Sequence, residues 1–356
     1  MLRIYTYRIP FKKPFKTAKD VFKHREGLII SYSENDITAF GEIAPLPGFS
    51  EENLDQVREV LIMNKEHLEQ AFLNGDAEQT IRLLEQIHQF PSLGFGLDTL
   101  LHDLKAKKRQ MSLPQLLFEE QNHTISVNAV LPIAEKDDSL RQASKLISKG
   151  FQTLKIKVGH NFGKEIDLLN DLRTQFPVLN IRIDANQAWT TEEAILNLRN
   201  MEHLNIEYCE QPVSANDLTS LKEVKDAVNI PIAADESVRN KNLAHEVIQN
   251  NAADLIIIKP MLMGTFKNIS VTKELADTHN IKVVFTTSLE TAVGRSAVTA
   301  LATGLASKNL AQGLSTGSFF RSDIGHNHWL EGAIIRYPEG QGTGISVHLD
   351  TLNELN

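Results

Sequence analysis

The chain is poor in cysteine and has no long apolar run. Its single cysteine, Cys209, excludes a disulfide within the chain and fits a reducing compartment. No stretch approaches the roughly 20 consecutive apolar residues that a membrane-spanning helix needs. The opening residues, MLRIYTYRIP, lack the apolar segment of a signal peptide and enter a strand-like pattern at once. We therefore expect a cytoplasmic protein with no membrane partner.

The chain also lacks an excess of positive charge. It carries 37 Lys and Arg against 45 Asp and Glu, a net charge of -8. A nucleic-acid-binding protein needs a basic face to neutralise phosphates, so this balance argues against that class. A hydrophobic fraction of 42% and a charged fraction of 23% are ordinary for a globular protein. The 356 residues suffice for two cores, or for one barrel with a smaller attached domain.

Residues 1–123 read as an α+β domain. The first part is extended, a second strand covers 37–43, and Pro45-Leu46-Pro47-Gly48 marks a loop. From Ser50 onward the apolar spacing becomes helical, and Ser50 is a candidate N-cap because Glu51 and Glu52 follow it. The sequence therefore predicts a small sheet followed by helices in this part of the chain.

After His123 short strand patterns alternate with helical ones. The predicted strands are 125–131, 153–158, 180–184, 206–210, 230–235, 254–259, 282–287 and 310–314. Thr190 and Glu193 have the spacing of a capping box at one helix start. Apolar strands that alternate with helices indicate a parallel sheet buried on both faces, and eight such units favour a closed barrel over 124–322. The tail, 323–356, contains no further strand–helix unit and is expected to return to the N-terminal domain.

Two lysines interrupt the predicted strand 153–158. Lys155 and Lys157 are two positions apart, so both side chains point to the same face of the strand. A central strand of a parallel barrel has no solvated face, and two buried ammonium groups are costly unless anions pair with them. A functional role for Lys155 and Lys157 is therefore favoured over a position on a solvated surface.

Carboxylates follow at the same end of the next three predicted strands. Asp184, Glu210 and Asp235 each close one strand, where the strand–helix loops of a barrel form the active-site mouth. Each alone also fits a helix-capping acid, and for Asp235 the two interpretations are about equal. Three carboxylates at one depth would resist ionisation unless a hard cation joined them. This pattern predicts a Mg²⁺ site, with Mn²⁺ as an alternative.

A third lysine, Lys259, ends the apolar run of the sixth predicted strand, across the barrel from Lys155 and Lys157. A cation that binds a carboxylate oxygen makes the neighbouring C–H bond more acidic. A lysine placed among other cations has a depressed pKa and can act as the base. The reaction class predicted from these residues is proton abstraction next to a carboxylate.

These residues resemble the muconate-lactonising branch of the enolase superfamily. The resemblance covers almost the whole chain and implies an α/β fold: a modified (β/α)7β TIM-type barrel, an α+β N-terminal cap, and a C-terminal tail that completes the cap. The residues that carry it, in the order and spacing of the family, are Lys155, Lys157, Asp184, Glu210, Asp235 and Lys259. The resemblance implies that Lys157 is the catalytic acid/base, that Lys155 lowers the pKa of Lys157 and touches the substrate carboxylate, and that Lys259 acts from the opposite face.

Within this branch, residues 40–50, 287–294 and 313–320 are most similar to o-succinylbenzoate synthases of menaquinone biosynthesis. That similarity implies a lyase that dehydrates 2-succinyl-6-hydroxy-2,4-cyclohexadiene-1-carboxylate to 2-succinylbenzoate through an enediolate. The substrate is then a small dicarboxylate. The further substrate contacts implied are Asn186, Ser288, Ser315 and Gly317.

Other functions remain open from the sequence. An N-acylamino acid racemase or dipeptide epimerase on the same scaffold would use Lys157 and Lys259 as two bases. Dipeptide epimerases place an Asp-x-Asp pair in the loop after the eighth strand, whereas 314–322 contains no acid before Asp323. From another class, a lysine Schiff-base aldolase needs only one lysine, and a non-catalytic barrel needs none. The oligomeric state cannot be read from the sequence.

Overall fold

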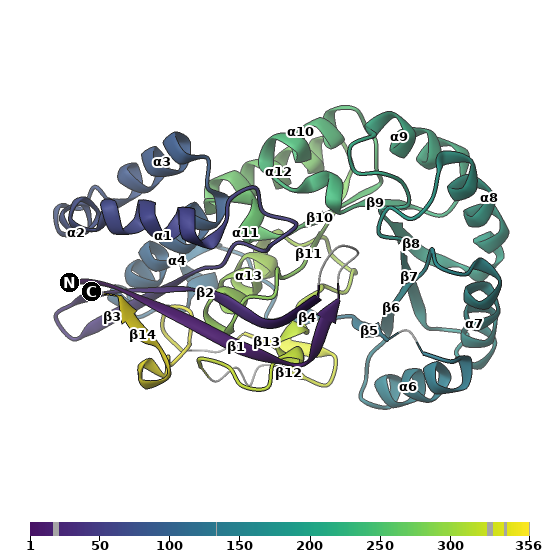
Figure 1. Ribbon diagram of the computed structural model, residues 1–356, viewed down its shortest axis with the longest axis horizontal. Coiled ribbons are helices and arrows are strands. Elements are labelled where there is room, and N and C mark those ends of the chain that lie inside the picture. The colour runs from purple at the N-terminus through teal and green to yellow at the C-terminus, as the bar shows by residue number, and fades with distance from the viewer. Residues whose placement is uncertain (17–20, 133, 326–329, 338–339, 356) are drawn as a thin grey trace.

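The structure, a computed structural model, describes residues 1–16, 21–132, 134–325, 330–337 and 340–355. The chain forms a cap that contains the first and last strands, and a curled parallel sheet surrounded by helices (Figure 1). No helix in these described ranges is long and apolar enough to cross a membrane.

The cap is an antiparallel sheet with helices packed on it. Its strands lie in the order β14-β1-β2-β3 and are β14 (Asn353–Leu355), β1 (Leu2–Lys16), β2 (Val21–Glu34) and β3 (Ile37–Ile43). Its helices are α1 (Leu54–Met63), α2 (Lys65–Asn74), α3 (Ala77–His88), α4 (Pro91–Lys108) and α5 (Leu113–Leu117). The pairing of Ile4 with Leu355 shows that the C-terminal tail completes the cap, as the sequence predicted.

Helix α1 begins later than the sequence predicted. Its N-cap is Asn53, whose side chain accepts a hydrogen bond from the Gln56 backbone while Gln56 reciprocates in a capping box. Ser50 instead accepts a hydrogen bond from the Leu46 backbone through Oγ, at 2.8 Å, and closes the preceding turn. The prediction of Ser50 as the cap was therefore wrong, because a second polar residue with a better-placed partner follows it.

Two glycines allow α4 to lie directly on β3. A Cβ on Gly41 would meet the Gly96 carbonyl oxygen at 2.1 Å, and a Cβ on Gly96 would meet Ile43 Cγ1 at 2.3 Å. Both positions therefore need glycine for close approach of the two backbones.

Replacing Gly96 by alanine is expected to lower the melting temperature, although alanine favours a helix by about 1 kcal/mol. The added methyl must displace β3, an overpacking cost of about 1–3 kcal/mol or more. Gly163→Ala is the matched control, because the nearest atom to its Cβ is 3.7 Å away. Equal melting temperatures for the two variants would contradict the packing argument, and differential scanning calorimetry makes the comparison.

Seven parallel strands form most of the barrel wall. In spatial order they are β11 (Lys282–Phe285), β10 (Leu255–Ile258), β9 (Ile232–Ala234), β8 (Ile206–Glu210), β7 (Asn180–Asp184), β6 (Thr153–Lys157) and β5 (Ala129–Leu131). The intervening helices are α6 (Lys136–Ser148), α7 (Phe162–Gln175), α8 (Thr191–Met201), α9 (Leu218–Ala227), α10 (Lys241–Gln249), α11 (Pro260–Met263), α12 (Phe266–Thr278) and α13 (Ala292–Leu305). Short 3₁₀ turns are η1 (Glu202–Leu204), η2 (Glu236–Val238), η3 (Thr316–Phe319) and η4 (Leu349–Thr351). The predicted capping box of Thr190 and Glu193 is present at α8.

The wall is closed by a short segment and not by a regular eighth strand. Gln312 forms a parallel bridge with Val127, and Gly313 forms one with Thr286 at the end of β11. The sequence predicted a strand at 310–314. The segment hydrogen-bonds to both neighbours but is too short to form a regular ladder. The predicted first strand is also divided, into β5 and β4 (Thr124–Ser126). Strand β4 pairs with the tail strand β13 (Ile334–Arg336), which pairs in turn with β12 (Leu330–Glu331).

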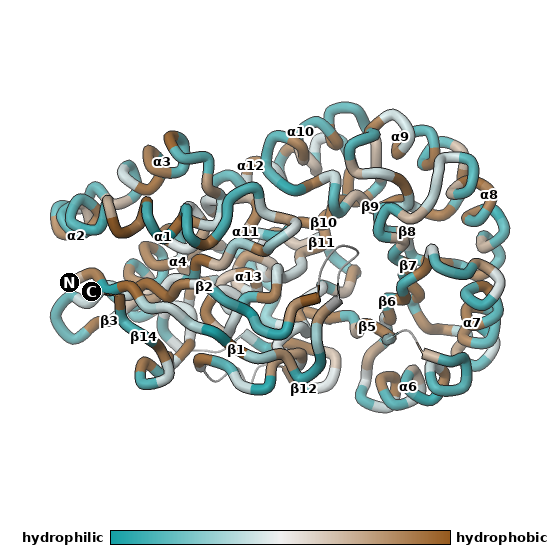
Figure 2. Tube along the Cα trace, viewed as in Figure 1, coloured by the Kyte–Doolittle hydropathy of each residue, from teal (hydrophilic) through white to brown (hydrophobic). Residues whose placement is uncertain are grey.

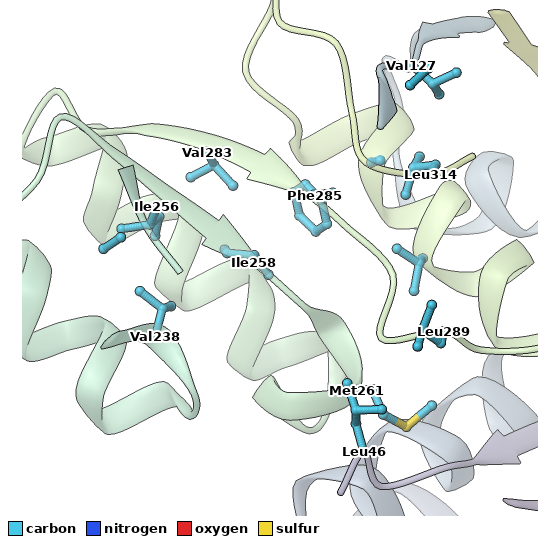
Figure 3. Close-up of a cluster of buried hydrophobic side chains, with 14 of the residues drawn as sticks. Leu46, Val127, Val238, Ile256, Ile258, Met261, Val283, Phe285, Leu289 and Leu314 are labelled. Atoms are coloured by element: carbon cyan, nitrogen blue, oxygen red, sulfur yellow. The ribbon is translucent and has the colours of Figure 1, made fainter. Parts of the chain in front are cut away.

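Side chains of the barrel strands alternate between two cores. Leu255 and Ile257 of β10 belong to a cluster inside the barrel, whereas Ile256 and Ile258 pack toward the helices, near Val283 and Phe285 of β11 (Figure 3). Along α7 and α8 hydrophilic and hydrophobic residues alternate, as expected of helices with one buried face (Figure 2). The alternation along each strand also determines whether the residue that follows the strand points into the barrel or away from it.

Candidate active site

The parity of β8 and β10 directs the predicted acid and lysine into the barrel. Tyr208 lies in the inner cluster, so Glu210, two residues later, points to the same side. Lys259 follows Ile257 in the same way. Cys209 has the opposite parity and packs in the outer core, where the sequence placed it.

Lys155 lies among the three carboxylates that the sequence singled out. Its Nζ is 2.8 Å from Asp184 Oδ2 and also contacts Glu210. Burial by itself would lower the pKa of Lys155, but the charges of Asp184, Glu210 and Asp235 outweigh it and raise that pKa well above its usual value. Lys155 is therefore held as a cation.

Burial also affects the pKa values of the acids. The Glu210 side chain is 3% exposed. Burial, reinforced by Asp184 and Asp235 and opposed by Lys155, raises the pKa of Glu210 to about 8. Burial would likewise raise the pKa of Asp235, but Lys259 and then Lys155 reverse that effect and lower it. The three carboxylates thus repel one another in a site with little water.

Lys259 approaches the site from the opposite wall. Its ammonium group forms an ion pair with Asp235. On its other side it lies 4.8 Å from the centroid of the Phe49 ring, which belongs to a loop of the cap. The cap thus contributes directly to the environment of a predicted catalytic lysine.

Lys157 is partly exposed at the mouth, on the same face of β6 as Lys155. Its Nζ donates a hydrogen bond of 2.7 Å to Asn186 Oδ1. Asn186 Nδ2 donates in turn to Glu236 Oε1, at 3.1 Å. Lys157 therefore has a neutral partner, in contrast to the ion-paired Lys155 and Lys259.

A cavity of about 90 Å³ lies at this end of the barrel. It is lined by Asn128, Val130, Lys155, Tyr208, Glu210, Asp235, Ile257, Lys259, Val284, Thr286, Gly313, Ser315, Thr316 and Phe319. Of the predicted site residues it includes Lys155, Glu210, Asp235, Lys259 and Ser315. The structure therefore brings these five residues to one cavity.

The other predicted substrate contacts are placed differently. Ser288 is 1% exposed, and its Oγ has no hydrogen-bond partner among the described residues. Gly317 lies beside the Arg295 guanidinium, so close that a Cβ would meet Arg295 Cζ at 2.8 Å. Ser315 Oγ donates to the Asn128 carbonyl, at 2.8 Å. Neither Ser288 nor Gly317 lines the cavity, so their roles remain predictions.

A buried arginine of the cap holds the loop that contains Ser288. Arg25, 4% exposed, donates from Nε to the Leu289 carbonyl at 3.0 Å and from Nη1 to the Pro45 carbonyl at 2.9 Å. It thereby links the loop after β11 to the cap loop that leads to Phe49. Glu42 makes a second link, since it accepts hydrogen bonds from the backbone amides of Thr291 (2.9 Å) and Gly294 (2.8 Å).

The donor set suits a hard divalent cation, although the lysines occupy the space between the acids. Within the described ranges no three acidic, histidine or cysteine side chains are arranged to hold a metal ion. The reason is that Lys155 separates Asp184 from Glu210, and Lys259 contacts Asp235. Yet Asp184, Glu210 and Asp235 supply only oxygen donors, and a substrate carboxylate would add more negative charge. An all-oxygen set with excess negative charge fits Mg²⁺.

Sequence reasoning missed Phe49 and Glu236, which lie near the predicted catalytic groups, and Arg25, which holds the loop that contains Ser288. The sequence did contain a signal for two of them. Glu236 directly follows Asp235, and Phe49 lies in the loop segment, 40–50, that carried the family resemblance. Arg25 gave no signal, because its partners are backbone carbonyls distant in the sequence.

Comparison with known proteins decides the family. Residues 138–351 match the family model described as "Enolase C-terminal domain-like", and residues 1–104 match "MenC, N-terminal domain". The chain belongs to the enolase superfamily. Its barrel and cap correspond to the two matched parts, and its structural neighbours share the same cap-and-barrel architecture.

Members of the superfamily with different activities are similar to this chain. The N-succinyl-L-Arg/Lys racemase of Bacillus cereus is 26% identical, covering 99% of this chain and 96% of that protein. The L-Ala-D/L-Glu epimerase of Bacillus subtilis is 32% identical, covering 86% and 85%. The o-succinylbenzoate synthase of Pasteurella multocida is 31% identical, covering 84% of each.

Solved structures agree with this assignment. The substrate-liganded L-Ala-D/L-Glu epimerase of Bacillus subtilis superposes with a TM-score of 0.86 at 27% identity, covering 97% of this chain and 98% of that one. A dipeptide epimerase of Enterococcus faecalis, complexed with Mg and the dipeptide L-Leu-L-Tyr, gives 0.85 at 27% identity, with coverage of 97% and 98%. The likeness establishes the superfamily and leaves the specific substrate to the chemistry of the site.

Proposed function

We propose that this enzyme dehydrates 2-succinyl-6-hydroxy-2,4-cyclohexadiene-1-carboxylate to 2-succinylbenzoate, as o-succinylbenzoate synthases do. The observation that carries the proposal is the position of Asp323, the first acid after the closing segment of the barrel. Its side chain is 19% exposed and pairs with Arg295 at 2.7 Å. It also accepts hydrogen bonds from the backbone amides of Ala292 (2.9 Å) and Ile324 (2.8 Å).

Asp323 is thus engaged in holding the start of α13. A dipeptide presents a free α-ammonium group, which is costly to desolvate without a carboxylate partner. Between Leu314 and Ser322, all of which the structure describes, the loop contains no acid, and Arg321 carries its only charge. The cavity lining instead contains Ser315 and Thr316, whose hydroxyls bond to the Asn128 carbonyl (2.8 Å) and to Thr287 Oγ1 (2.6 Å) in this structure, beside Lys155 and Lys259. Hydroxyls and cations suit a succinyl carboxylate better than an ammonium group.

A second pocket, of about 360 Å³, lies on the cap side of the mouth and contains three acids. Each of them already has a partner. Glu26 pairs with Arg8 at 2.9 Å, Glu51 accepts from Asn240 at 2.8 Å, and Glu52 accepts from the Ser92 amide at 2.9 Å. None of these three acids lines the cavity that contains Lys155 and Lys259.

In the proposed reaction Lys157 removes the proton from C1 of the substrate, next to the carboxylate. The C6–O bond then breaks, and Lys157 returns the proton to the departing hydroxide, so that water and the aromatic product are released. Lys259, which forms an ion pair with Asp235, stabilises the negative charge that develops on the substrate carboxylate. Mg²⁺ held by Asp184, Glu210 and Asp235 would supply further charge stabilisation at that carboxylate.

The proposal is tested by comparing kcat/KM for three substrate types with the purified protein and Mg²⁺. We expect dehydration of the cyclohexadiene to exceed epimerisation of unblocked dipeptides by ~10²-fold or more, since an unpaired buried charge costs several kcal/mol. N-succinylamino acids should also react, although slowly. They can react because their succinyl group places an anionic arm where the cyclohexadiene places its own.

Asp323→Asn serves as the control for the loop argument. If Asp323 only anchors α13, the variant loses thermal stability while the ratio between the substrate types stays the same. A dipeptide epimerised faster than the cyclohexadiene is dehydrated would overturn the proposal.

Racemisation of N-succinylamino acids is the second candidate, favoured by one observation. Lys157 and Lys259 approach the site from opposite walls, as a two-base reaction requires, and the Bacillus cereus racemase is similar over 99% of this chain. Lys259, however, is 8% exposed and paired with Asp235, which favours an electrostatic role over that of a second base.

A further inference from the structure

Glu236 is a buried acid to which the proposed reaction assigns no role. It begins the 3₁₀ turn η2, directly after Asp235, and is 7% exposed. Its Oε1 accepts the hydrogen bond from Asn186 Nδ2 at 3.1 Å, whereas its Oε2 is buried and has no hydrogen-bond partner among the described residues. A carboxylate with an unused buried oxygen costs stability, so stability does not explain its presence.

The hydrogen bond to Glu236 determines how the Asn186 amide is oriented. An ammonium group only donates hydrogen bonds and an ionised carboxylate only accepts them. The amide between Lys157 and Glu236 must therefore turn its oxygen to Lys157 and its NH₂ group to Glu236, as observed. In the flipped orientation the NH₂ group would face the ammonium, and donor would meet donor.

The backbone supports this arrangement from the other side. Asn186 has a φ of 43°, in the left-handed region, and its backbone N–H donates to Asp184 Oδ1 at 3.1 Å. This conformation places the side chain at the mouth but does not determine which end of the amide faces Lys157. That choice is set by Lys157, which needs an acceptor, together with Glu236, which accepts from the NH₂ group and holds it in place.

We propose that Glu236 is a positioning residue, which acts through Asn186 to hold the Lys157 ammonium at the mouth of the barrel. The inference rests on the proposed function only in making Lys157 the group that exchanges the substrate α-proton. It applies equally to dehydration and to racemisation, because both begin with that proton transfer.

The test compares Glu236→Ala and Glu236→Gln with the unmodified enzyme, on whichever substrate that enzyme turns over. Misplacement of a reacting group by about 1 Å costs ~10²-fold, so we expect Glu236→Ala to lower kcat by ~10- to 10²-fold with little change in KM. Glu236→Gln retains a carbonyl oxygen that can accept from Asn186, and should recover most of the loss. The kinetic isotope effect of an α-deuterated substrate should rise in the alanine variant.

Three further measurements separate positioning from other roles. The melting temperature should be unchanged or higher in Glu236→Ala, and Mg²⁺ affinity by calorimetry should stay within a few-fold. The double variant with Asn186→Ala should be no slower than the slower single variant, because both residues act through Lys157. A crystal structure of Glu236→Ala should show the Asn186 amide rotated and Lys157 displaced.

A kcat of Glu236→Ala equal to that of the unmodified enzyme would overturn the inference. So would losses that multiply in the double variant, or a Mg²⁺ affinity that falls in parallel with kcat, which would make Glu236 a metal ligand. Failure of the proposed function is seen separately, in the substrate preference of the unmodified enzyme.

Discussion

Replacing Lys157 by alanine is expected to lower kcat by ~10²- to 10⁴-fold, the usual contribution of a general base, and by more if it also assists departure of the hydroxide. Lys157 extends from the end of β6 at the partly exposed mouth, where its Nζ donates to the neutral amide oxygen of Asn186. Turnover is followed by the absorbance of the aromatic product, and α-proton exchange in D₂O reports the first step alone.

Lys164→Ala is the matched control, since Lys164 is an exposed lysine on α7, shortly after β6. It should retain full activity. Lys155→Ala should also reduce activity, by removing a cation from among Asp184, Glu210 and Asp235. Substantial turnover by Lys157→Ala would refute the assigned role, whatever Lys155→Ala does.

Removal of divalent metal is expected to abolish turnover while the fold persists. The acids that would hold Mg²⁺ lie at the ends of β7, β8 and β9, where the barrel opens, and not in either hydrophobic core. Treatment with a chelator should therefore leave the circular dichroism spectrum nearly unchanged, and Mg²⁺ or Mn²⁺ should restore activity. Full activity in protein shown by elemental analysis to be metal-free would exclude this role.

Glu210→Gln sharpens the same prediction, because it removes the charge and keeps the shape. It should weaken Mg²⁺ binding, measured by calorimetry, far more than it lowers the melting temperature. Burial already raises the pKa of Glu210 to about 8, which means that the folded protein disfavours its charged form, so removal of the charge should cost little stability. Glu192→Gln, at an exposed position of α8, should bind Mg²⁺ as the unmodified protein does.

Strand periodicity explains why the placement of the candidate catalytic side chains was predictable. Side chains alternate with a period of two, so an acid or lysine that shares parity with inner apolar residues must point into the barrel. Lys259 after Leu255 and Ile257 is one example, and Glu210 after Tyr208 is another. The parallel arrangement then brings all strand ends to one mouth, which requires no knowledge of the loops.

Local rules were less reliable where two candidates compete. The glutamate three residues after Thr190 correctly predicts a cap there, whereas the helix expected to begin at Ser50 is capped by Asn53, whose partner Gln56 completes a capping box. The closing segment of the barrel was predicted as a strand, although only Gln312 and Gly313 form bridges. Element identity depends on periodicity over many residues, whereas an element boundary depends on one or two hydrogen bonds.

The sequence by itself determined the superfamily, the barrel with its cap, and which residues are candidates for the chemistry, because these depend on repeated patterns within single strands. Only the tertiary structure decided which partners those residues have. Asp323 is engaged by Arg295, Glu236 orients Asn186 toward Lys157, and Phe49 of the cap covers Lys259. Each of these contacts joins side chains from different elements. Their geometry is set by how helices, loops and strands pack together, and no spacing along the chain encodes it.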